Sequence, residues 1–115
     1  MGFSRIEVIT AMNKVADLQT ALSKTKASGI TVAQVLGCGV QNGTYEYEIK
    51  QKKEMSVLPK QMLTIIVEDE IVEEVLDVIK KELYTGHIGD GKIFVSQVTR
   101  VIRVRTGEEG IDALK

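Results

Sequence analysis

Residues 85–110, which read TGHIGDGKIFVSQVTRVIRVRTGEEG, decide how the rest of this 115-residue chain is interpreted. The stretch holds five of the ten glycines of the chain. Gly86, Gly89 and Gly91 leave the backbone free to take a positive φ and to approach a ligand closely, and Lys92 follows directly. A loop of this composition is suited to binding a phosphate group. An ordinary turn before a strand explains the GDGK residues equally, so this motif alone decides nothing.

Two arginines in the segment VIRVR, Arg103 and Arg105, strengthen the case for an anion site. Side chains two residues apart leave the same face of a strand, and their forked guanidinium groups can hold phosphate oxygens in pairs. The alternative interpretation is an alternating arginine pair on a solvated strand face. Because the glycines and the arginines lie within one short stretch, phosphate binding stays open beside these structural explanations.

The composition limits the number of domains and the classes of function. Of the 115 residues 43% are hydrophobic, which suffices for one core, and we expect a single domain over residues 1–115. The net charge of −1 argues against nucleic-acid binding as the main task. Cys38 is the single cysteine, which excludes an internal disulfide framework. No amino-terminal segment has the apolar length of a signal peptide or a membrane helix, so we expect a cytoplasmic protein without direct membrane insertion.

Hydrophobic periodicity predicts the order β-α-β-β-α-β with a short extra strand. Asn13 is the expected cap of the first helix, Gly29 stands where a helix commonly ends in left-handed geometry, and Pro59 leads into a central strand. The predicted elements are a strand over 3–10, a helix over about 14–27, strands over 31–36 and 63–67, a helix over about 70–84, and strands over 92–98 and 101–104. This order favours an α+β ferredoxin-like sandwich, an antiparallel sheet with both helices on one face.

Such a sandwich leaves one face of the sheet uncovered. The predicted central strands carry apolar residues to both sides, so we expect an isolated monomer to expose Val and Ile in bulk. Association between subunits should cover these residues.

Residues 40–57 lack an apolar core pattern, and their three glutamates balance their three lysines. A segment of this length is expected to be mobile or to be ordered by a partner. Within it, TYEYEIK alternates Tyr45, Tyr47 and Ile49 with charged residues. This pattern suits either a strand half-buried against a partner or a solvated hairpin, and both remain open.

The stretch 85–110 resembles the carboxy-terminal signature of the PII signal-transduction family. Residues 30–43, ITVAQVLGCGVQNG, resemble the strand that leads into the long effector loop of that family, and residues 57–67, VLPKQMLTIIV, the strand that leaves it. The resemblance covers nearly the whole chain without an evident gap. It implies a ferredoxin-like fold, a homotrimer around a three-fold axis, ATP or ADP bound in the clefts between subunits, and an effector loop over about residues 40–58.

The resemblance also implies a set of residues that grip the phosphates. Gly89, Gly91 and Lys92 would line the phosphates from one subunit, while Arg103 and Arg105 would reach the same phosphates from the neighbour. Around the base, the resemblance implies a wall of Gly37, Cys38 and Gly39, apolar contacts from Ile9 and Ile66, and a hydrogen bond from Thr31 of the adjoining subunit, with Gly29 and Asp90 completing the set. Core packing alone would also explain Ile9 and Ile66.

Two residues at the feet of the loop match positions that bind further ligands in the family. Gln41 matches the residue that helps hold Mg²⁺ with ATP and 2-oxoglutarate, and Lys60 matches the residue that pairs with the oxoacid. Ordinary surface residues explain a lone Gln and a lone Lys as well, so 2-oxoglutarate binding stays open.

The effector loop departs from the family pattern. Lys53 stands where many relatives carry a uridylylated tyrosine, and Gln51 stands where some carry a phosphorylated serine. Covalent control at these positions is therefore not expected, and any modification of Tyr45 or Tyr47 stays open. The segment IKQKKEM replaces the usual loop tip, so the identity of the partner is open too. Tyr45, Tyr47 and Ile49 are the expected contacts to a partner.

The leading hypothesis is a regulatory protein, not an enzyme, that senses ATP against ADP and changes the conformation of its loop. Its expected partner is a membrane transporter, the ATPase subunit of a transporter, or another regulatory or nitrogen-metabolism protein. The alternative is a weak ATPase or phosphotransferase on the same trimer, but the chain lacks a GxxxxGKS/T loop and a paired acid and base beside GDGK. A metal-binding trimer would need clustered ligands, and His87 and Cys38 lie far apart in sequence.

Overall fold

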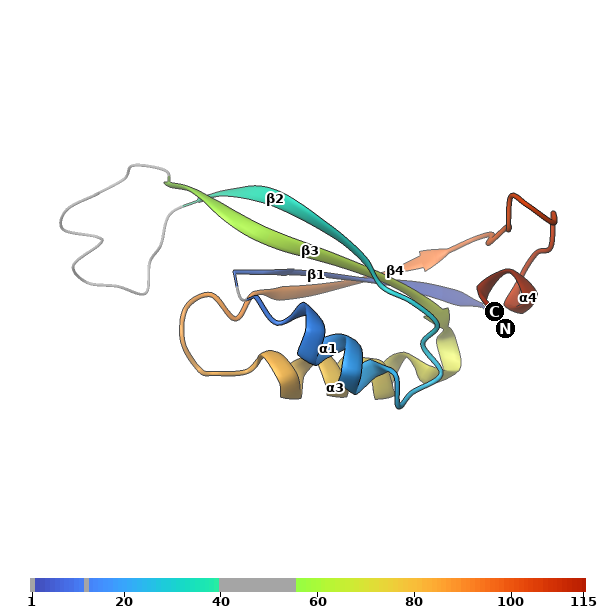
Figure 1. Ribbon diagram of the computed structural model, residues 1–115, viewed down its shortest axis with the longest axis horizontal. Coiled ribbons are helices and arrows are strands. Elements are labelled where there is room, and N and C mark those ends of the chain that lie inside the picture. The colour runs from blue at the N-terminus through green and yellow to red at the C-terminus, as the bar shows by residue number, and fades with distance from the viewer. Residues whose placement is uncertain (1, 12, 40–55) are drawn as a thin grey trace.

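The computed structural model describes residues 2–11, 13–39 and 56–115, and its elements follow the predicted order. Two long helices pack against each other on one face of a four-stranded sheet (Figure 1). The strands are β1 (Phe3–Thr10), β2 (Thr31–Gly39), β3 (Ser56–Glu68) and β4 (Lys92–Val98). The helices are α1 (Val15–Leu22), the 3-10 turn η1 (Asp69–Ile71), α3 (Val72–Leu83) and α4 (Ile111–Leu114).

The strand order is β2-β3-β1-β4, and every neighbouring pair is antiparallel. This arrangement confirms the predicted ferredoxin-like sandwich. β2 and β3 continue past the end of β1, so that Gly39 pairs with Ser56 at the foot of the segment 40–55. Pro59 lies in this extension, beyond the last β1 partner Gln61, where its missing N–H removes no hydrogen bond to a second neighbour.

The core lies between the helices and the inner face of the sheet, and it is aliphatic. Ser4, Ile6, Val8 and Thr10 of β1 are buried at every second position, as the period of a strand requires. The hydrophobic core consists of Ile6, Val8, Leu18, Leu22, Leu63, Ile65, Val67, Val72, Val75, Ile79 and Leu83. Full burial of such a side chain stabilises the fold by about 1.5–3 kcal/mol.

The ends of α1 differ from the prediction. Lys14, not Asn13, holds the N-cap position, and Asn13 Oδ1 instead accepts a hydrogen bond from Gln61 Nε2 at 3.5 Å. The helix ends at Leu22, well before Gly29, whose φ lies outside the left-handed region. Hydroxyl groups explain the early end, because Ser23 Oγ donates to the Thr20 carbonyl at 2.6 Å and so satisfies a carbonyl of the last turn.

The predicted strand over residues 101–104 is wrong. After β4 the chain leaves the sheet and forms a projection that ends in α4 (Figure 1). Within it, Ile102 makes an isolated bridge with Glu109, and the Gly107 N–H donates to the Arg103 carbonyl at 2.7 Å. Gly107 has φ 76°, which lets the backbone close this tight turn. Arg103 and Arg105 therefore do not share the face of a strand.

The outer face of the sheet is more polar than predicted. Arg5 and Glu7 of β1 both lie on this face, and Arg5 Nη2 is 3.7 Å from Glu7 Oε2. By the register of the strands, the apolar residues of this outer face are Phe3, Ile9, Ala33, Val35, Leu58, Met62, Ile66, Phe94 and Val98. Charged and hydroxyl side chains lie among these apolar ones. Elsewhere on the strands Val32, Val57 and Val95 are exposed, so this chain alone does leave valines uncovered, as expected. Phe94 is 51% exposed, so an apolar surface still remains uncovered.

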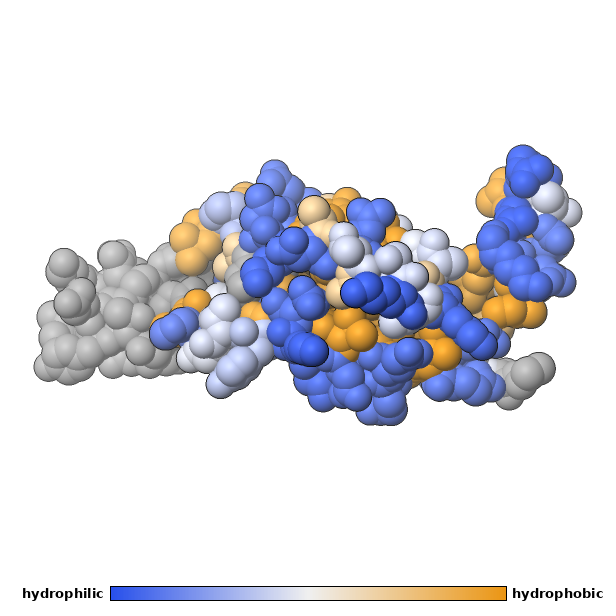
Figure 2. Space-filling view, turned by 60° about the horizontal axis from the view of Figure 1, so that its bottom comes forward, coloured by the Kyte–Doolittle hydropathy of each residue, from blue (hydrophilic) through white to orange (hydrophobic). Residues whose placement is uncertain are grey.

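The helical side of the molecule has the character of an outer surface. In Figure 2 hydrophilic side chains predominate over this side, with hydrophobic ones visible between them. α3 bears Glu73, Glu74 and Asp77 on its exposed positions and Lys80 and Lys81 near its end, which complements the helix dipole. Among the described residues, no helix is long and apolar enough to cross a bilayer.

Gly91 has no room for a side chain, and this gives a test of the fold. Its φ is 99°, and an added Cβ would lie 2.8 Å from Thr10 Cα and closer still to the Ile9 carbonyl oxygen. We predict that Gly91→Ala lowers the free energy of unfolding by at least about 2 kcal/mol, as urea denaturation would measure. Gly29→Ala is the matched control, because nothing lies within 4 Å of its added Cβ. Equal stability of the two variants would contradict this packing of β4 on β1.

Candidate functional site

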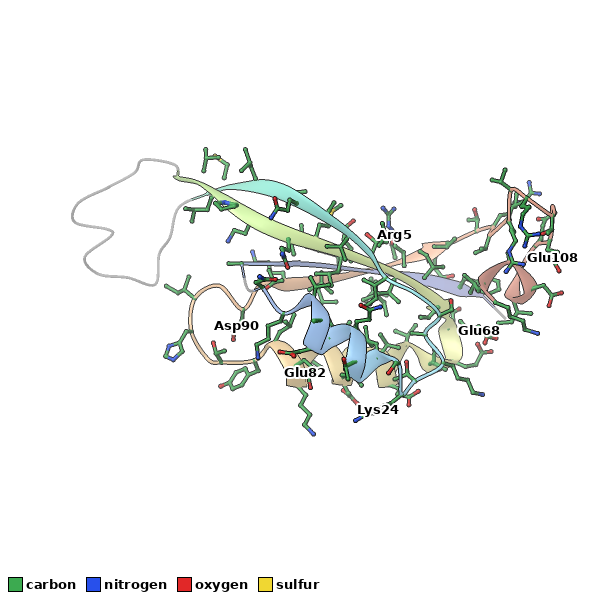
Figure 3. All side chains as sticks on the ribbon, viewed as in Figure 1. Arg5, Lys24, Glu68, Glu82, Asp90 and Glu108 are labelled. Atoms are coloured by element: carbon green, nitrogen blue, oxygen red, sulfur yellow. The ribbon has the colours of Figure 1, made fainter. Side chains whose placement is uncertain are left out.

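The Asp90 carboxylate organises the loop of residues 85–91 between α3 and β4. Its Oδ2 accepts hydrogen bonds from the backbone N–H groups of Thr85 at 2.9 Å and Gly86 at 3.0 Å. Its Oδ1 accepts from the Thr85 hydroxyl at 2.5 Å, and that hydroxyl accepts from the His87 N–H at 3.1 Å. Asp90 is labelled inside this loop in Figure 3. The loop is thus closed around a negative charge that its own donors satisfy.

These donors also set the ionisation of Asp90. The Thr85 hydroxyl has the largest effect in holding the pKa of the Asp90 carboxyl below its ordinary value, followed by the Thr85 N–H. The Gly86 N–H and the charge of His87 act in the same direction. At neutral pH Asp90 is therefore an ionised group whose hydrogen bonds hold the loop in shape.

The glycine loop is docked on the end of β1. The Ala11 N–H donates to the Gly89 carbonyl at 3.1 Å, and the Thr10 hydroxyl donates to the same oxygen at 3.2 Å. The φ angles are 83° at Gly86, 108° at Gly89 and 99° at Gly91, which confirms the predicted left-handed backbone at these glycines. At Gly91 the missing side chain lets the loop backbone lie directly against Ile9 and Thr10.

Lys92 is the first residue of β4 and lies on the outer face of the sheet. It pairs with Ile9, which pairs on its other side with Met62, so these residues form one cross-strand row. Lys60 lies two positions along β3 from Met62 and therefore shares this face. A Cβ added at Gly37 would be 3.0 Å from Lys60 Cγ, so the Lys60 side chain lies across that glycine.

This end of the outer face, which we call the anion corner, thus combines two ammonium groups with glycine backbone. It consists of the loop 85–91, Lys92, Ile9, Lys60 and Gly37. The two cationic side chains favour polyanions, while Ile9 and the glycines offer a surface on which a flat apolar group can lie. Further along β2 from Gly37, Cys38 pairs with Val57 and Gly39 pairs with Ser56. Cys38 is exposed.

Several of the predicted residues lie away from the anion corner. Ile66 pairs with Arg5, four positions along β3 from Met62, on the same outer face. Thr31 pairs with Thr64 at the start of β2, at the opposite end of that strand from Gly37, and Gly29 lies two residues earlier. One subunit therefore does not bring Thr31 and Gly29 to the corner.

Arg103 and Arg105 lie beyond the far end of β4. Six residue steps in a strand span about 20 Å, so Lys92 and Val98 are already separated by that length, and Arg103 follows five residues later. In Figure 3 Asp90 is labelled in the loop before β4, and Glu108 is labelled in the projection on the other side of the sheet, near α4. The structure therefore does not bring Lys92 and Arg103 together within one chain.

Arg103 has partners that its sequence position did not reveal. Its Nη1 lies 3.0 Å from Glu108 Oε1, and its Nη2 donates to the backbone oxygen of Lys115. Glu108 and Thr85 were both missed in the sequence analysis. The spacings T-x-E at residues 106–108 and T-x-x-x-x-D at residues 85–90 carry a weak signal, since Thr and acidic side chains commonly close turns.

A hollow on the helical side was also not predicted. Its volume is about 470 Å³, and it lies between the end of α3, the glycine loop and the edge of β4. Val8, Ile79, Leu83, Tyr84 and Ile93 are the apolar residues that line it. Hydrophobic periodicity cannot reveal such a space, because it depends on how far α3 extends over the edge strand.

The loop residues singled out in the sequence lie outside the described residues. They are Gln41, Tyr45, Tyr47, Ile49, Gln51 and Lys53.

Comparisons with known proteins agree on one family. The model of the family described as "Nitrogen regulatory protein P-II" matches residues 3–108. A nitrogen regulatory protein P-II of Bradyrhizobium diazoefficiens is 40% identical, over 96% of this chain and 98% of that protein. The nitrogen regulatory protein GlnK of Escherichia coli K12 is 41% identical, over 95% of this chain and 97% of that protein.

Solved structures show the same similarity in three dimensions. GlnK of B. subtilis has a TM-score of 0.84 at 34% identity and covers 99% of this chain and 100% of its own. The B. subtilis GlnK-ATP complex has a TM-score of 0.82 at 34% identity and covers 98% of both chains. PII of Arabidopsis thaliana bound to citrate has a TM-score of 0.79 at 35% identity, covering 99% of this chain and 91% of its own. The ferredoxin-like sheet, the glycine loop and these matches lead to one conclusion: the chain belongs to the nitrogen regulatory protein P-II family.

Proposed function

We propose that this chain is a PII-like regulatory protein that binds ATP or ADP between the subunits of a homotrimer. The observation that carries the proposal is the anion corner, where the closed glycine loop leads into Lys92 and the Lys60 side chain lies across Gly37 on the same outer face of the sheet. A relative with 34% identity and the same fold, GlnK of B. subtilis, has been solved in complex with ATP. The chemistry of the corner and the ligand of this relative are in agreement.

The separation of the cationic groups supports a site shared between subunits. Lys92 is the first residue of β4 and Arg103 lies beyond the other end of that strand, so the two can meet on one nucleotide only across an interface. We propose that the loop 85–91 and Lys92 of one subunit bind the phosphates together with Arg103 and Arg105 of its neighbour. Thr31 and Gly29, which lie away from the corner, would approach the base from that neighbour in the same way.

Further ligands of the proposed site involve the feet of the loop. An Arabidopsis relative has been solved with citrate, a small polycarboxylate. Lys60 lies across Gly37 and could pair with a carboxylate such as that of 2-oxoglutarate. Mg²⁺ bound with the nucleotide would neutralise phosphate charge, and Gln41 is the residue we propose to help hold it.

We propose that the bound nucleotide regulates a partner protein through the effector loop. The effector loop ends earlier than the predicted residue 58, because β3 begins at Ser56. A nucleotide changes the conformation of this loop only if it binds one conformation more tightly than another. Tyr45, Tyr47 and Ile49 would contact the partner, for which we propose a membrane transporter, the ATPase subunit of a transporter, or a nitrogen-metabolism protein. The cytoplasmic location stays a prediction.

The alternative, a weak ATPase or phosphotransferase, lacks support at the corner. The carboxylate in its glycine loop is Asp90, both of whose oxygens accept hydrogen bonds from the loop. A general base has to reach a proton of the substrate or of water, and Asp90 is already engaged in holding the loop. The relatives are named as regulatory proteins, which agrees with a protein that binds and does not catalyse.

Removing either half of the phosphate site tests the proposed function. We predict that Lys92→Gln and Arg103→Ala each weaken ATP and ADP binding at least about tenfold, because each removes a charge-assisted contact. Isothermal titration calorimetry would measure both ligands. Arg100→Ala is the matched control, since Arg100 lies in the same projection but pairs with Glu109 in an exposed position. Unchanged affinity in both test variants would rule out this site.

The trimer gives an independent test. The outer face keeps apolar residues such as Phe94 uncovered, and their burial contributes about 25 cal/mol per Å². Light scattering should give a mass three times that of the 12.7 kDa chain across micromolar dilution. Phe94→Asp should dissociate the oligomer, whereas Glu73→Lys on the helical side should not. A stable, folded wild-type monomer at micromolar concentration would show the proposed assembly to be wrong.

The Asp90 carboxylate predicts how the glycine loop responds to pH. Its pKa is lowered in the folded protein, so its stabilising effect is complete above the ordinary Asp range and is lost as the pH falls through the lowered pKa. The amide proton shifts of Thr85 and Gly86 should titrate with a midpoint below that range. Asp90→Asn should abolish this titration and speed amide exchange at both residues at neutral pH. Asp77→Asn, on an exposed helix position, should leave them unchanged. A midpoint at or above the ordinary range would contradict this account of the loop.

A further inference from the structure

We propose that Glu108 and the backbone oxygen of Lys115 hold the Arg103 guanidinium closed, so that a phosphate ligand has to displace them. We call this set of three residues the Arg103 latch. The inference rests on the proposed role of Arg103 in nucleotide binding and assigns Glu108 as a residue that sets the affinity of that site. It also connects the site to α4, the helix that precedes Lys115.

The contacts of Arg103 occupy both outer nitrogens of its guanidinium fork. Nη1 donates to Glu108 Oε1 at 3.0 Å, and Nη2 donates to the Lys115 backbone oxygen. The backbone adds a hydrogen bond from the Arg103 N–H to the Glu108 carbonyl at 2.9 Å. The side chain of Arg103 is only 26% exposed. Each outer nitrogen has a second N–H, but a phosphate has to compete with the Glu108 carboxylate and the Lys115 oxygen for the charge and the orientation of this guanidinium.

Glu108 is fixed in place for this contact. The Thr106 hydroxyl donates to the same Oε1 at 2.8 Å, and the Glu108 N–H donates back to that hydroxyl at 3.2 Å. The turn closed at Gly107 sets the spacing of these groups. The carboxylate is thus held against Arg103 by its own turn, which reduces the entropy lost in forming the pair.

A second arginine–glutamate pair in the same projection shows what is specific to the latch. Arg100 Nε and Nη2 lie 3.2 Å and 3.0 Å from Glu109 Oε1. The side chains of that pair are 66% and 54% exposed, so water can replace either partner at little cost. Only Arg103 of these two arginines also reaches the end of α4. Glu109 therefore serves as a control that matches Glu108 in charge and position.

The contacts of the Arg103 guanidinium with Glu108 and Lys115 have two consequences. The apparent affinity of a ligand falls by the fraction of molecules in which its site is closed, so Glu108 should weaken the binding of anions. Opening the latch also releases the Lys115 backbone oxygen, so nucleotide binding should loosen the end of α4. Other contacts also hold this segment, among them the hydrogen bond from the Gly110 N–H to the Val101 carbonyl at 3.0 Å and the packing of α4 against β3.

The test compares Glu108→Gln with Glu109→Gln in the full-length protein. Calorimetry with ATP, with ADP and with inorganic tripolyphosphate should show about three- to tenfold tighter binding for Glu108→Gln and a change of less than about twofold for Glu109→Gln. Amide exchange of residues 111–115 should speed up when ATP is added to the wild type. In Glu108→Gln it should be fast before any ligand is added. Thr106→Val, which keeps both charges and removes the hydroxyl donor, should shift the affinity in the same direction by a smaller factor.

The outcomes separate the latch from the nucleotide site. A wild type that binds no ATP would overturn both the proposed function and the latch. A wild type that binds ATP, together with a Glu108→Gln variant whose affinity is unchanged or weaker, would overturn the latch alone. Tighter binding in both glutamine variants would also refute it, because a general loss of negative charge would then explain the effect.

Discussion

The antiparallel register between β1 and β3 is the constraint on which the rest of the structure depends. Ile6 pairs with Ile65 and Val8 with Leu63, which directs these side chains to the helices. Because side chains alternate along a strand, a slip of one residue would turn this set to the outer face. The same register places Ile9 between Met62 and Lys92, so the core and the anion corner are fixed by one set of backbone hydrogen bonds.

Much of the fold was predictable from the sequence because its signals are local. The bounds of β1 and β4 were predicted correctly, since β-branched runs bounded by turn residues mark strands clearly. The cap at Asn13 and the strand at 101–104 were wrong for a shared reason. Both depended on local propensity, and in both places hydrogen bonds to other residues, Gln61 and Glu108, determine the structure.

The candidate site was predictable in composition but not in arrangement. Positive φ at Gly86, Gly89 and Gly91 was predicted from the freedom that a missing side chain gives the backbone, although Gly29 has the same freedom and does not use it. The distance between Lys92 and Arg103 follows from the direction in which the chain leaves β4, which no motif encodes. The partners of Asp90 and Arg103 depend on how turns close, so residue types near them in sequence gave only a weak signal.

Lys92 is the first residue of β4 and Arg103 lies beyond the opposite end of that strand, and this placement has a genetic consequence. In a closed ring of subunits, each cleft would take Lys92 from one copy and Arg103 from the next. A copy that lacks one group would therefore damage a cleft that it shares with an intact neighbour, so such an allele would be partly dominant. Conversely, two copies that each lack a different group could restore one intact cleft between them, which is intragenic complementation.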